Sequence, residues 1–311
     1  MTDALPDPRS PDPHDPIEPA AVVLPAVAFE PPLDERRPWL EDHEIVDALE
    51  VAGLETPVFV TAENVAVTTT GLGKSQAAAT VATLAAAPGV SLESAYVLSV
   101  GIAGSSPSKA ALGSVFLADT VVDWDRKHRW DPGSEEPSID VLAYDPEKSV
   151  HHVDGDLLEV AREAAGEVEL AEDGDVLEYQ RRYPDTPEMP SVGVGPTVTG
   201  DEFWHGATLA QEVEWFCREY DLEPFLTTQM EDAATVAALE RFGLDGQYLS
   251  VRAVANYDRP APDQSVEDSF EGPPESLALA IENATAVGSA VVGRLLECDP
   301  LGLLDDETPS A

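Results

Sequence analysis

Positive charge is what this sequence has least of. Its 311 residues include 17 Lys and Arg against 60 Asp and Glu, which gives a formal net charge of −43 at pH 7. Without a basic patch the chain cannot displace the counterions of a nucleic acid, so we expect no nucleic-acid partner. A dense acidic surface repels itself at low ionic strength, and molar salt, with a Debye length of about 3 Å, screens that repulsion. The composition therefore predicts a protein adapted to high salt.

Cysteine and long apolar runs are also scarce. The two cysteines, Cys217 and Cys298, cannot build a disulfide framework and indicate a reducing interior. No stretch reaches the roughly 18 uninterrupted apolar residues that a membrane helix needs. Residues 1–18 are acidic and rich in proline, unlike a signal peptide. We therefore expect a cytoplasmic protein without a membrane partner.

A high net charge is also typical of disordered chains. Here, however, 43% of the residues are hydrophobic and fall in patterned runs, which is enough to build a core. Strand-like runs cover 20–29, 56–70, 95–100, 115–122, 191–199, 224–228 and 248–255. Helix-like runs cover 74–87, 154–165, 230–242 and 276–296. Strands that alternate with helices predict an α/β fold with a parallel or mixed sheet, in one large domain or two smaller ones.

Glycine and polar residues follow several of these strand-like runs. In open α/β sheets, ligands bind at the carboxyl ends of the strands. A repeated coincidence of this kind predicts a binding site more strongly than any one turn does. The residues concerned are Gly71 and Gly73, Gly101 and Gly104, Gly200 with Asp201 and Glu202, Met230 and Glu231, and Asn256.

Each of these features also has a purely structural interpretation. The turn before Lys74 resembles a nucleotide-binding loop, but Thr68 stands where that pattern needs a glycine. The turn either holds an anion at a helix N-terminus or only joins a strand to a helix. Glu231 and Asp232 could instead cap the helix or serve its dipole. Phe203, Trp204 and His205 form either a stacking surface or a core loop. We expect no metal site, because the pair of histidines at 151 and 152 lacks partners at ligand spacing.

Taken together and in order, the motifs resemble the purine nucleoside permease family, a branch of the nucleoside phosphorylase superfamily. The resemblance runs from about residue 22 to residue 296 and is carried by the ordered set rather than by one motif. The motifs are Gly101-Ile102-Ala103-Gly104 with Pro107 and Gly113-Ser114, then Met230-Glu231-Asp232, then Arg252-Ala253-Val254-Ala255-Asn256-Tyr257-Asp258.

This resemblance implies a single-domain nucleoside phosphorylase-like fold of the α/β class, with a twisted mixed β-sheet flanked by helices. The domain would cover 19–299, between a disordered arm at 1–18 and an acidic tail at 300–311. Superfamily members usually assemble as trimers or hexamers, so we expect a homo-oligomer. Their chemistry is cleavage of a nucleoside by phosphate, or by water in some branches. The expected reaction is phosphorolysis, which needs inorganic phosphate as co-substrate and no cofactor.

The resemblance also assigns roles to the sugar site. Met230 would pack against the ribose, and Glu231 would hydrogen-bond the ribose hydroxyls and orient the sugar for catalysis. The stretch that contains Gly101, Ala103 and Gly104 would line the purine.

At the base, Asn256 stands where many superfamily members carry an Asp that acts as a general acid. An amide cannot deliver a proton as a carboxylic acid does, but it can hydrogen-bond purine N7 and O6. Phe203 is a further expected base-binding residue, and Glu202 or Asp201 would accept from N1–H and the 2-amino group. We therefore expect a 6-oxopurine nucleoside, with guanosine favoured over inosine.

Phosphate binding is the weakest part of this hypothesis. Residues 98–100 read Leu-Ser-Val, where related phosphorylases often have an arginine. Lys74, beside the turn at Gly73, is the first candidate for a phosphate ligand. Two alternatives need no phosphate site: a nucleoside-binding or uptake protein without turnover, and a nucleoside hydrolase. We also expect activity to require salt near molar.

Overall fold

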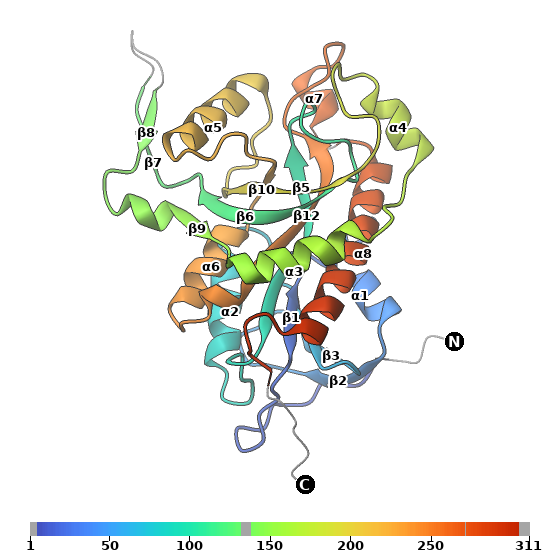
Figure 1. Ribbon diagram of the computed structural model, residues 1–311, viewed down its shortest axis with the longest axis vertical. Helices are drawn as coiled ribbons and strands as arrows, with labels where there is room; N and C mark the ends of the chain where they lie inside the picture. Colours follow the sequence, from blue (N-terminus) through green and yellow to red (C-terminus); the bar gives the residue numbers. More distant parts are fainter. Residues whose placement is uncertain (1–4, 132–137, 271, 305–311) are drawn as a thin grey trace.

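The computed structural model describes residues 5–131, 138–270 and 272–304. A large mixed β-sheet runs through the centre of the molecule, with helices packed against it (Figure 1). Its strands lie in the order β11-β10-β6-β12-β5-β1-β4-β3-β2, with β9 beside β6. They are β1 (Ala21–Leu24), β2 (Ile45–Leu49), β3 (Val58–Thr61), β4 (Val65–Val67), β5 (Tyr96–Ser105), β6 (Val115–Asp123), β9 (Val150–His152), β10 (Val192–Thr199), β11 (Thr227–Gln229) and β12 (Tyr248–Tyr257). A separate hairpin pairs β7 (Lys127–Arg129) with β8 (Ile139–Val141).

The two long strands at the centre of the sheet position the site. β5 and β12 are parallel, and nearly every residue in both is buried. This explains their continuous Val- and Ala-rich sequences, since a strand covered on both faces needs no alternation. β11 returns to β5 through the pairing of Thr228 with Gly104. The carboxyl ends of β5 and β12 therefore meet β11 at one place.

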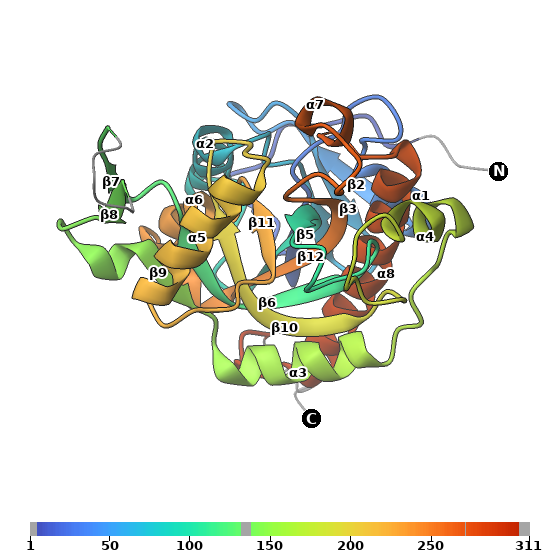
Figure 2. The ribbon, with the colours of Figure 1, turned by 90° about the horizontal axis from the view of Figure 1, so that it is seen from above.

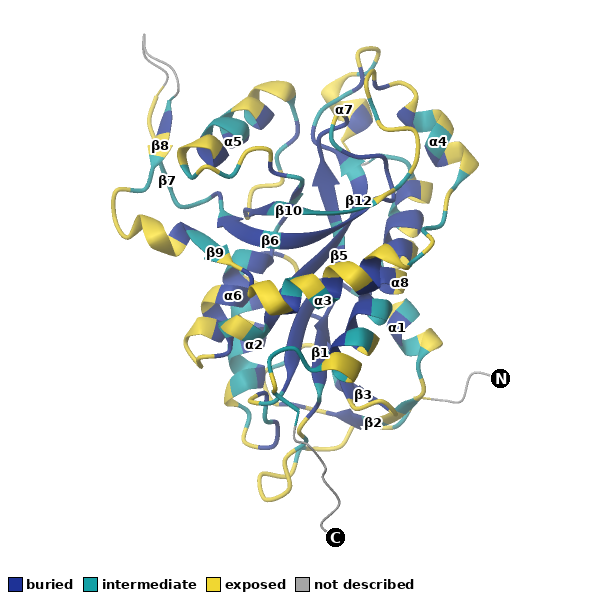
Figure 3. Ribbon diagram, viewed as in Figure 1, coloured by how far each residue is buried: buried dark blue, intermediate teal, exposed yellow. Residues whose placement is uncertain are grey.

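Helices cover the sheet from two sides, as the view from above shows (Figure 2). α3 and α8 share one hydrophobic cluster with the sheet, and α2 and α6 share another. The central strands are buried while the outer faces of the helices are exposed (Figure 3). The helices are α1 (Arg37–Asp42), α2 (Lys74–Ala86), α3 (Gly155–Gly166), α4 (Gly174–Gln180), α5 (Ala207–Glu219), α6 (Asp232–Glu240), α7 (Val266–Ser269) and α8 (Pro274–Cys298), with 3₁₀ turns at Pro146–Ser149 and Asp245–Gln247. The predicted α/β class, with a mixed sheet flanked by helices, is confirmed.

α8 bears on the expectation that the sequence has no helix able to cross a membrane. Among the residues that the structure describes, this helix is long and apolar enough to cross a membrane by length and composition, although Glu282 and Asn283 interrupt it. In the fold, 61% of its apolar window is buried, and it packs on β12, β5 and α3. A core helix passes the same test, so α8 by itself does not place the chain in a membrane.

The two ends of the chain also differ from the expected arm and tail. Residues 5–18 are not a free arm, because Arg9 pairs with β2 through backbone bonds to Ala48 and Glu50. Ile17 pairs in the same way with Val90. At the other end, Leu301 donates its N–H to the hydroxyl of Tyr96 at 3.2 Å. The rest of the expected arm, 1–4, and of the tail, 305–311, lies outside the described residues.

Candidate functional site

A cavity of about 330 Å³ lies where the ends of β5, β11 and β12 meet the loops that follow β1 and β10. The cavity thus lies at the strand ends where the sequence predicts a binding site, and ligand binding there stays a prediction. The lining residues are Ala26, Val27, Phe29, Leu33, Glu35, Leu72, Ile102, Ala103, Gly104, Gly200, Glu202, Phe203, Trp204, Thr228, Gln229, Met230, Glu231, Arg252, Asn256 and Asp258.

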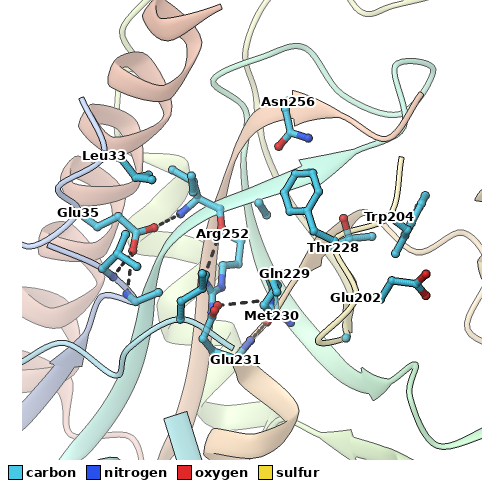
Figure 4. Close-up of a pocket in the computed structure, with 18 of the residues that line it drawn as sticks. Leu33, Glu35, Glu202, Trp204, Thr228, Gln229, Met230, Glu231, Arg252 and Asn256 are labelled. Carbon is cyan, nitrogen blue, oxygen red and sulfur yellow. Dashed lines mark hydrogen bonds and ion pairs between the residues drawn. The ribbon is translucent and has the colours of Figure 1, made fainter. Parts of the chain in front are cut away.

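The cavity has two distinct sides (Figure 4). Leu33 and Glu35 lie on one side, and Glu202 and Trp204 lie on the other. Between them are the residues expected to bind the sugar, Met230 and Glu231, with Arg252 nearby; Asn256 lies further along β12.

Glu35 is the most unusual group on the first side. It is only 3% exposed, yet no lysine or arginine side chain forms a hydrogen bond with it in the described residues. Instead, its Oε2 accepts from the backbone N–H of Ala26 at 2.8 Å and of Val27 at 3.0 Å, and its Oε1 accepts from Ile102 at 2.7 Å. Burial raises the pKa of Glu35 above its ordinary value, although Arg252 and the three N–H groups oppose the shift.

Arg252 faces Glu35 across Gly101. A side-chain Cβ at position 101 would lie 2.4 Å from Glu35 Oε1 and 3.2 Å from Arg252 Nη1. Only a glycine leaves room for both groups, which explains the residue at this point of β5. Gly101 does not line the cavity itself. The position of Gly101 therefore does not support the contact with the purine that was expected of it. Instead, Gly101 leaves room for the Glu35 carboxylate and the Arg252 guanidinium to approach each other.

The charge of Arg252 is already offset by the protein. Its guanidinium donates to both oxygens of Asp232, a residue with no exposed surface. Its Nη2 also lies 3.5 Å from Glu231 Oε2. Asp232 accepts a further hydrogen bond from Ser250 at 2.6 Å. The arginine is therefore a fixed part of the cavity wall rather than a free cation.

Glu231 lies where the sugar is expected. Its Oε1 accepts from the backbone N–H of Gly73 at 3.0 Å, and it is only 4% exposed. Burial raises the pKa of Glu231 to about 7, while Arg252 and the Gly73 N–H act in the opposite direction. Met230 lines the cavity beside it. The expected ribose residues are thus brought together, and their contact with a sugar stays a prediction.

The expected base residues Ala103, Gly104 and Asn256 also line one wall. Asn256 is paired in register with Gly104, and its Nδ2 donates to the carbonyl of Tyr257 at 3.3 Å. A Cβ at Gly104 would lie 2.9 Å from Thr228 Oγ1. Thr228 therefore occupies the space that a side chain at position 104 would need.

The loop after β10 supplies the remaining base residues. Glu202 and Phe203 both line the cavity and are exposed. The Phe203 ring packs against Phe270, with centroids 4.8 Å apart. Of the two interpretations of this loop, a stacking surface agrees better with Phe203 than a core position does. Asp201, the alternative acceptor for the base, points elsewhere and accepts from the backbone N–H of Lys74 at 2.7 Å.

The predicted phosphate ligands are the main correction. Neither Gly73 nor Lys74 lines the cavity. The Lys74 ammonium pairs with Asp123 at 2.6 Å and with Asp125 at 3.3 Å, and the Gly73 N–H is taken by Glu231. The helix N-terminus that could have held an anion is thus occupied by the protein's own carboxylates.

Sequence reasoning missed Glu35 as a site residue and did not assign Arg252 a role. Glu35 lies in a proline-broken loop where no spacing or periodicity marks it. Arg252 belongs to the motif that contains Asn256. A single cation in an otherwise apolar buried strand could have marked it as a site residue. Thr228 and Gln229 were also missed, because β11 is short.

Comparison with solved structures identifies the fold. The 5′-methylthioadenosine/S-adenosylhomocysteine nucleosidase of Neisseria meningitidis matches with a TM-score of 0.58 and 19% identity, over 89% of this chain and 98% of that one. The futalosine hydrolase of Helicobacter pylori matches with a TM-score of 0.57 and 18% identity, over 88% of this chain and 97% of that one. At this identity the likeness establishes the fold alone.

Sequence comparison identifies the family. A Schizosaccharomyces pombe protein named "probable purine nucleoside permease" is 28% identical, with 62% of this chain aligned to 64% of that protein, which is less than two thirds of its length. The purine nucleoside permease of Candida albicans is 23% identical, over 85% of this chain and 72% of that one. The family model described as purine nucleoside permease (NUP) matches residues 19–298. The chain therefore belongs to the purine nucleoside permease family.

Proposed function

We propose that this chain binds a purine nucleoside in the cavity and cleaves its N-glycosidic bond with water. The family name and the nucleosidase-like fold support the nucleoside. The choice of water over phosphate follows from the charge of the cavity, and it replaces phosphorolysis as our preferred reaction.

Among the lining residues that the structure describes, Arg252 is the one lysine or arginine. Glu35, Glu231, Glu202 and Asp258 line the same cavity, and Asp232 already offsets the charge of Arg252. A phosphate dianion would have to enter this acidic surrounding without a free cation, at a high electrostatic cost. A neutral water molecule has no such cost. This charge balance is the observation that carries the proposal.

Glu35 is the base that we assign to the reaction. Water attacks C1′ of the ribose and forms a C–O bond, and its proton passes to the Glu35 carboxylate. The C1′–N9 bond breaks, and its electron pair stays with the purine, which takes up a proton from solvent. The products are the free base and ribose.

The remaining roles follow the layout of the cavity. Met230 and Glu231 hold the ribose, Asn256 hydrogen-bonds the purine, and Phe203 stacks on it. Glu202 accepts from N1–H and the 2-amino group of the base. On this basis the expected substrate remains a 6-oxopurine nucleoside, with guanosine ahead of inosine.

A second candidate is a nucleoside-binding protein that does not turn its ligand over. Asn256 favours it, because an amide in the leaving-group position has no proton to give to the departing purine. The names of the relatives also fit uptake better than catalysis.

One experiment separates the candidates. Purified protein in molar KCl is mixed with guanosine, inosine or adenosine, with and without phosphate, and free base is followed by chromatography. Release that does not depend on phosphate supports the hydrolase, and binding without release supports the second candidate. Release that requires phosphate and yields ribose 1-phosphate contradicts our proposal. Faster cleavage of adenosine than of guanosine contradicts the assigned base.

Compartment and assembly are separate parts of the proposal. The net charge of −43 supports a high-salt cytoplasm. We further propose a trimer or hexamer, to be measured by light scattering in molar KCl. Loss of the fold on dialysis to low salt is the expected outcome, and an unchanged melting temperature would contradict salt adaptation.

A further inference from the structure

We propose that the cavity prefers a purine nucleoside whose base carries a positive charge, as a 6-oxopurine alkylated at N7 does. This inference rests on the proposed function, because it names the class of substrate for the same site. Alkylation at N7 makes the imidazole ring of the base a cation and leaves the sugar and the N1 edge as they are. Three features of the cavity support a cationic base: its carboxylates, its aromatic rings and the amide of Asn256.

Carboxylates outnumber cations in the cavity wall. Glu35, Glu202, Glu231 and Asp258 line the cavity, and Arg252 is the one lysine or arginine among the described lining residues. The guanidinium of Arg252 is already paired with a buried aspartate behind the wall. The wall therefore has a net negative charge before any ligand binds, and a positive base is attracted to it while a neutral base is not.

The buried carboxylates gain most from a cation. Glu35, Glu231 and Asp258 are each only 3 to 4% exposed, and burial raises the pKa of all three above the ordinary values. The ionised forms are costly there because the carboxylates have lost the water around them. An opposite charge close by favours the ionised form. A positive base in the cavity therefore returns part of the stabilisation that these groups lose on folding.

Aromatic rings supply a second kind of contact with a cation. Phe29, Phe203 and Trp204 line the cavity, and Phe29 and Phe203 are 54% and 51% exposed. A cation over an aromatic face is attracted by the ring, and quaternary ammonium groups are commonly bound by sets of aromatic side chains. Among the described residues, each lysine or arginine that lies over an aromatic ring uses a ring outside the cavity, namely Phe59, Trp124, Tyr179 or Phe225.

Asn256 is the third feature that favours a charged base. Its amide stands where the leaving purine is expected and has no proton to give to N7. A base alkylated at N7 needs none, because its positive charge already attracts the electron pair of the breaking C1′–N9 bond. One hydrogen of Asn256 Nδ2 donates to the carbonyl of Tyr257 at 3.3 Å. The amide nitrogen has two hydrogens, so the other can donate to O6 of the base.

The reaction of such a substrate balances without an external acid. Water forms the bond to C1′ and gives a proton to the Glu35 carboxylate, as in the proposed hydrolysis. The C1′–N9 bond breaks and its electron pair stays with the base, so that the cationic ring becomes a neutral N7-alkylated purine. The positive charge of the substrate thus ends as the proton on Glu35, and ribose is the second product.

The charge of the cavity also favours a free nucleoside over a nucleotide or the end of an RNA chain. A 5′-phosphate would lie in the same acidic surrounding, where the described lining residues offer no cation other than the paired Arg252. Its negative charge would cancel the attraction that the base gains. We therefore expect 7-methylguanosine to bind more tightly than its 5′-monophosphate does.

The test measures the binding of 7-methylguanosine, guanosine and 7-methylguanosine 5′-monophosphate by calorimetry in molar KCl. Molar salt screens long-range attraction, so a preference that remains reports contacts inside the cavity. We expect 7-methylguanosine to bind about 10-fold more tightly than guanosine, as a desolvated cation on an aromatic face does. Equal affinity for the two nucleosides, or tighter binding of the monophosphate, overturns the proposal.

Two variants separate the charge from the ring. Glu202→Gln removes a charge and Phe203→Leu removes an aromatic face, and each should reduce the ratio of the two affinities by about 3-fold or more. Glu163→Gln is the control, because it removes an exposed charge on α3 outside the cavity, and it should leave the ratio unchanged. Circular dichroism verifies that each variant is folded. A ratio that stays the same in both cavity variants overturns the proposal.

Turnover allows this inference and the proposed function to fail separately. The original chain should cleave 7-methylguanosine faster than guanosine. Asn256→Asp should raise kcat on guanosine and leave kcat on 7-methylguanosine unchanged, since only guanosine needs a proton at N7; an equal gain on both contradicts the role of the charge. Preferential binding of 7-methylguanosine without any cleavage retains the inference and rejects the hydrolase. Cleavage of guanosine together with equal affinity for the two nucleosides does the reverse.

Discussion

Arg252 on β12 and Asp232 at the start of α6 form a buried ion pair in which both carboxylate oxygens accept from the guanidinium. The two residues are 2% and 0% exposed. The pair joins the central sheet to the helix that carries the proposed ribose site. It also orients Arg252 so that its Nη1 points toward the backbone of β5, 3.4 Å from the carbonyl of Ile102.

Asp232→Asn should strongly destabilise the protein. Loss of one partner leaves Arg252 buried without its main counter-charge, which costs about 3 to 5 kcal/mol. Chemical unfolding in molar KCl measures this change. Ser250→Ala is the control, since it removes only the hydrogen bond to Asp232 and should cost about 1 kcal/mol. If the two variants lose the same free energy of unfolding, the ion pair contributes no more to stability than one hydrogen bond does.

Glu231 should make stability depend on pH. Its pKa is about 7 in the folded chain, against 4.5 ordinarily. The unfolded chain therefore gives up this proton first as pH rises, and the folded state loses stability between about pH 4.5 and 7. The total is on the order of 3 kcal/mol, since one pKa unit corresponds to about 1.4 kcal/mol. Glu231→Gln should not lose stability over this pH range. If the free energy of unfolding changes with pH in the same way in Glu231→Gln and in the original chain, the raised pKa of Glu231 is refuted.

Lys74→Ala should lower stability and leave the reaction unchanged. The lysine bridges Asp123 and Asp125 at a partly buried position, so its removal should cost about 2 kcal/mol. Cleavage of nucleosides with and without phosphate should be the same as in the original chain. Lys148→Ala, which breaks an exposed pair with Glu240, should change stability by less than about 1 kcal/mol. If phosphate accelerates cleavage in the original chain but not in Lys74→Ala, Lys74 is a phosphate ligand after all.

Asn256→Asp should accelerate release of the base. A carboxylic acid at this position can give the departing purine a proton, and such general acid catalysis contributes about 100-fold or more. Initial rates are measured between pH 5 and 8, with the largest gain expected at the acidic end, where the carboxylic acid is protonated. Asn64→Asp adds the same charge away from the cavity and should leave the rate unchanged. No gain in Asn256→Asp at any pH would place Asn256 outside the leaving-group site.

Phe203→Ala should weaken nucleoside binding. Stacking of a base on an aromatic ring contributes about 1 to 3 kcal/mol, so the dissociation constant should rise at least 5-fold. Calorimetry with guanosine in molar KCl measures it. Phe242 is also exposed but does not line the cavity, and Phe242→Ala should bind as the original chain does. Equal affinity in both variants would assign the stacking role to Trp204 instead.

Much of the fold could be predicted from local patterns. The strands at 95–100 and 248–255 are mostly apolar and rich in valine and alanine, as is typical of strands that are buried on both faces. The helix from Lys74 follows a glycine turn and is rich in alanine, which has the highest helix propensity. α5 was missed because its sequence mixes acidic and aromatic residues, and only its packing against β10 and the neighbouring loop makes it a helix of the core.

The residues predicted for the site line one cavity where the chain itself brings them together. Met230 and Glu231 are adjacent in sequence, and Asn256 stands at the end of a predictable strand. The phosphate ligands were wrong, because the partners of Lys74 lie 49 and 51 residues away. No local pattern shows that two aspartates neutralise that lysine.

The sequence by itself determined the charge of the protein, its α/β class and the strand ends where the cavity lies, because these depend on composition and on short-range order. Only the tertiary structure decided which charges meet. It brought Glu35 from an irregular loop into a nest of backbone N–H groups, and it paired Arg252 with Asp232 while Lys74 was bound elsewhere. Electrostatic energy depends on distance and burial, and both are fixed only when distant segments pack together. The choice between water and phosphate as the nucleophile therefore depends on the charges that the fold brings together, and not on the sequence motifs.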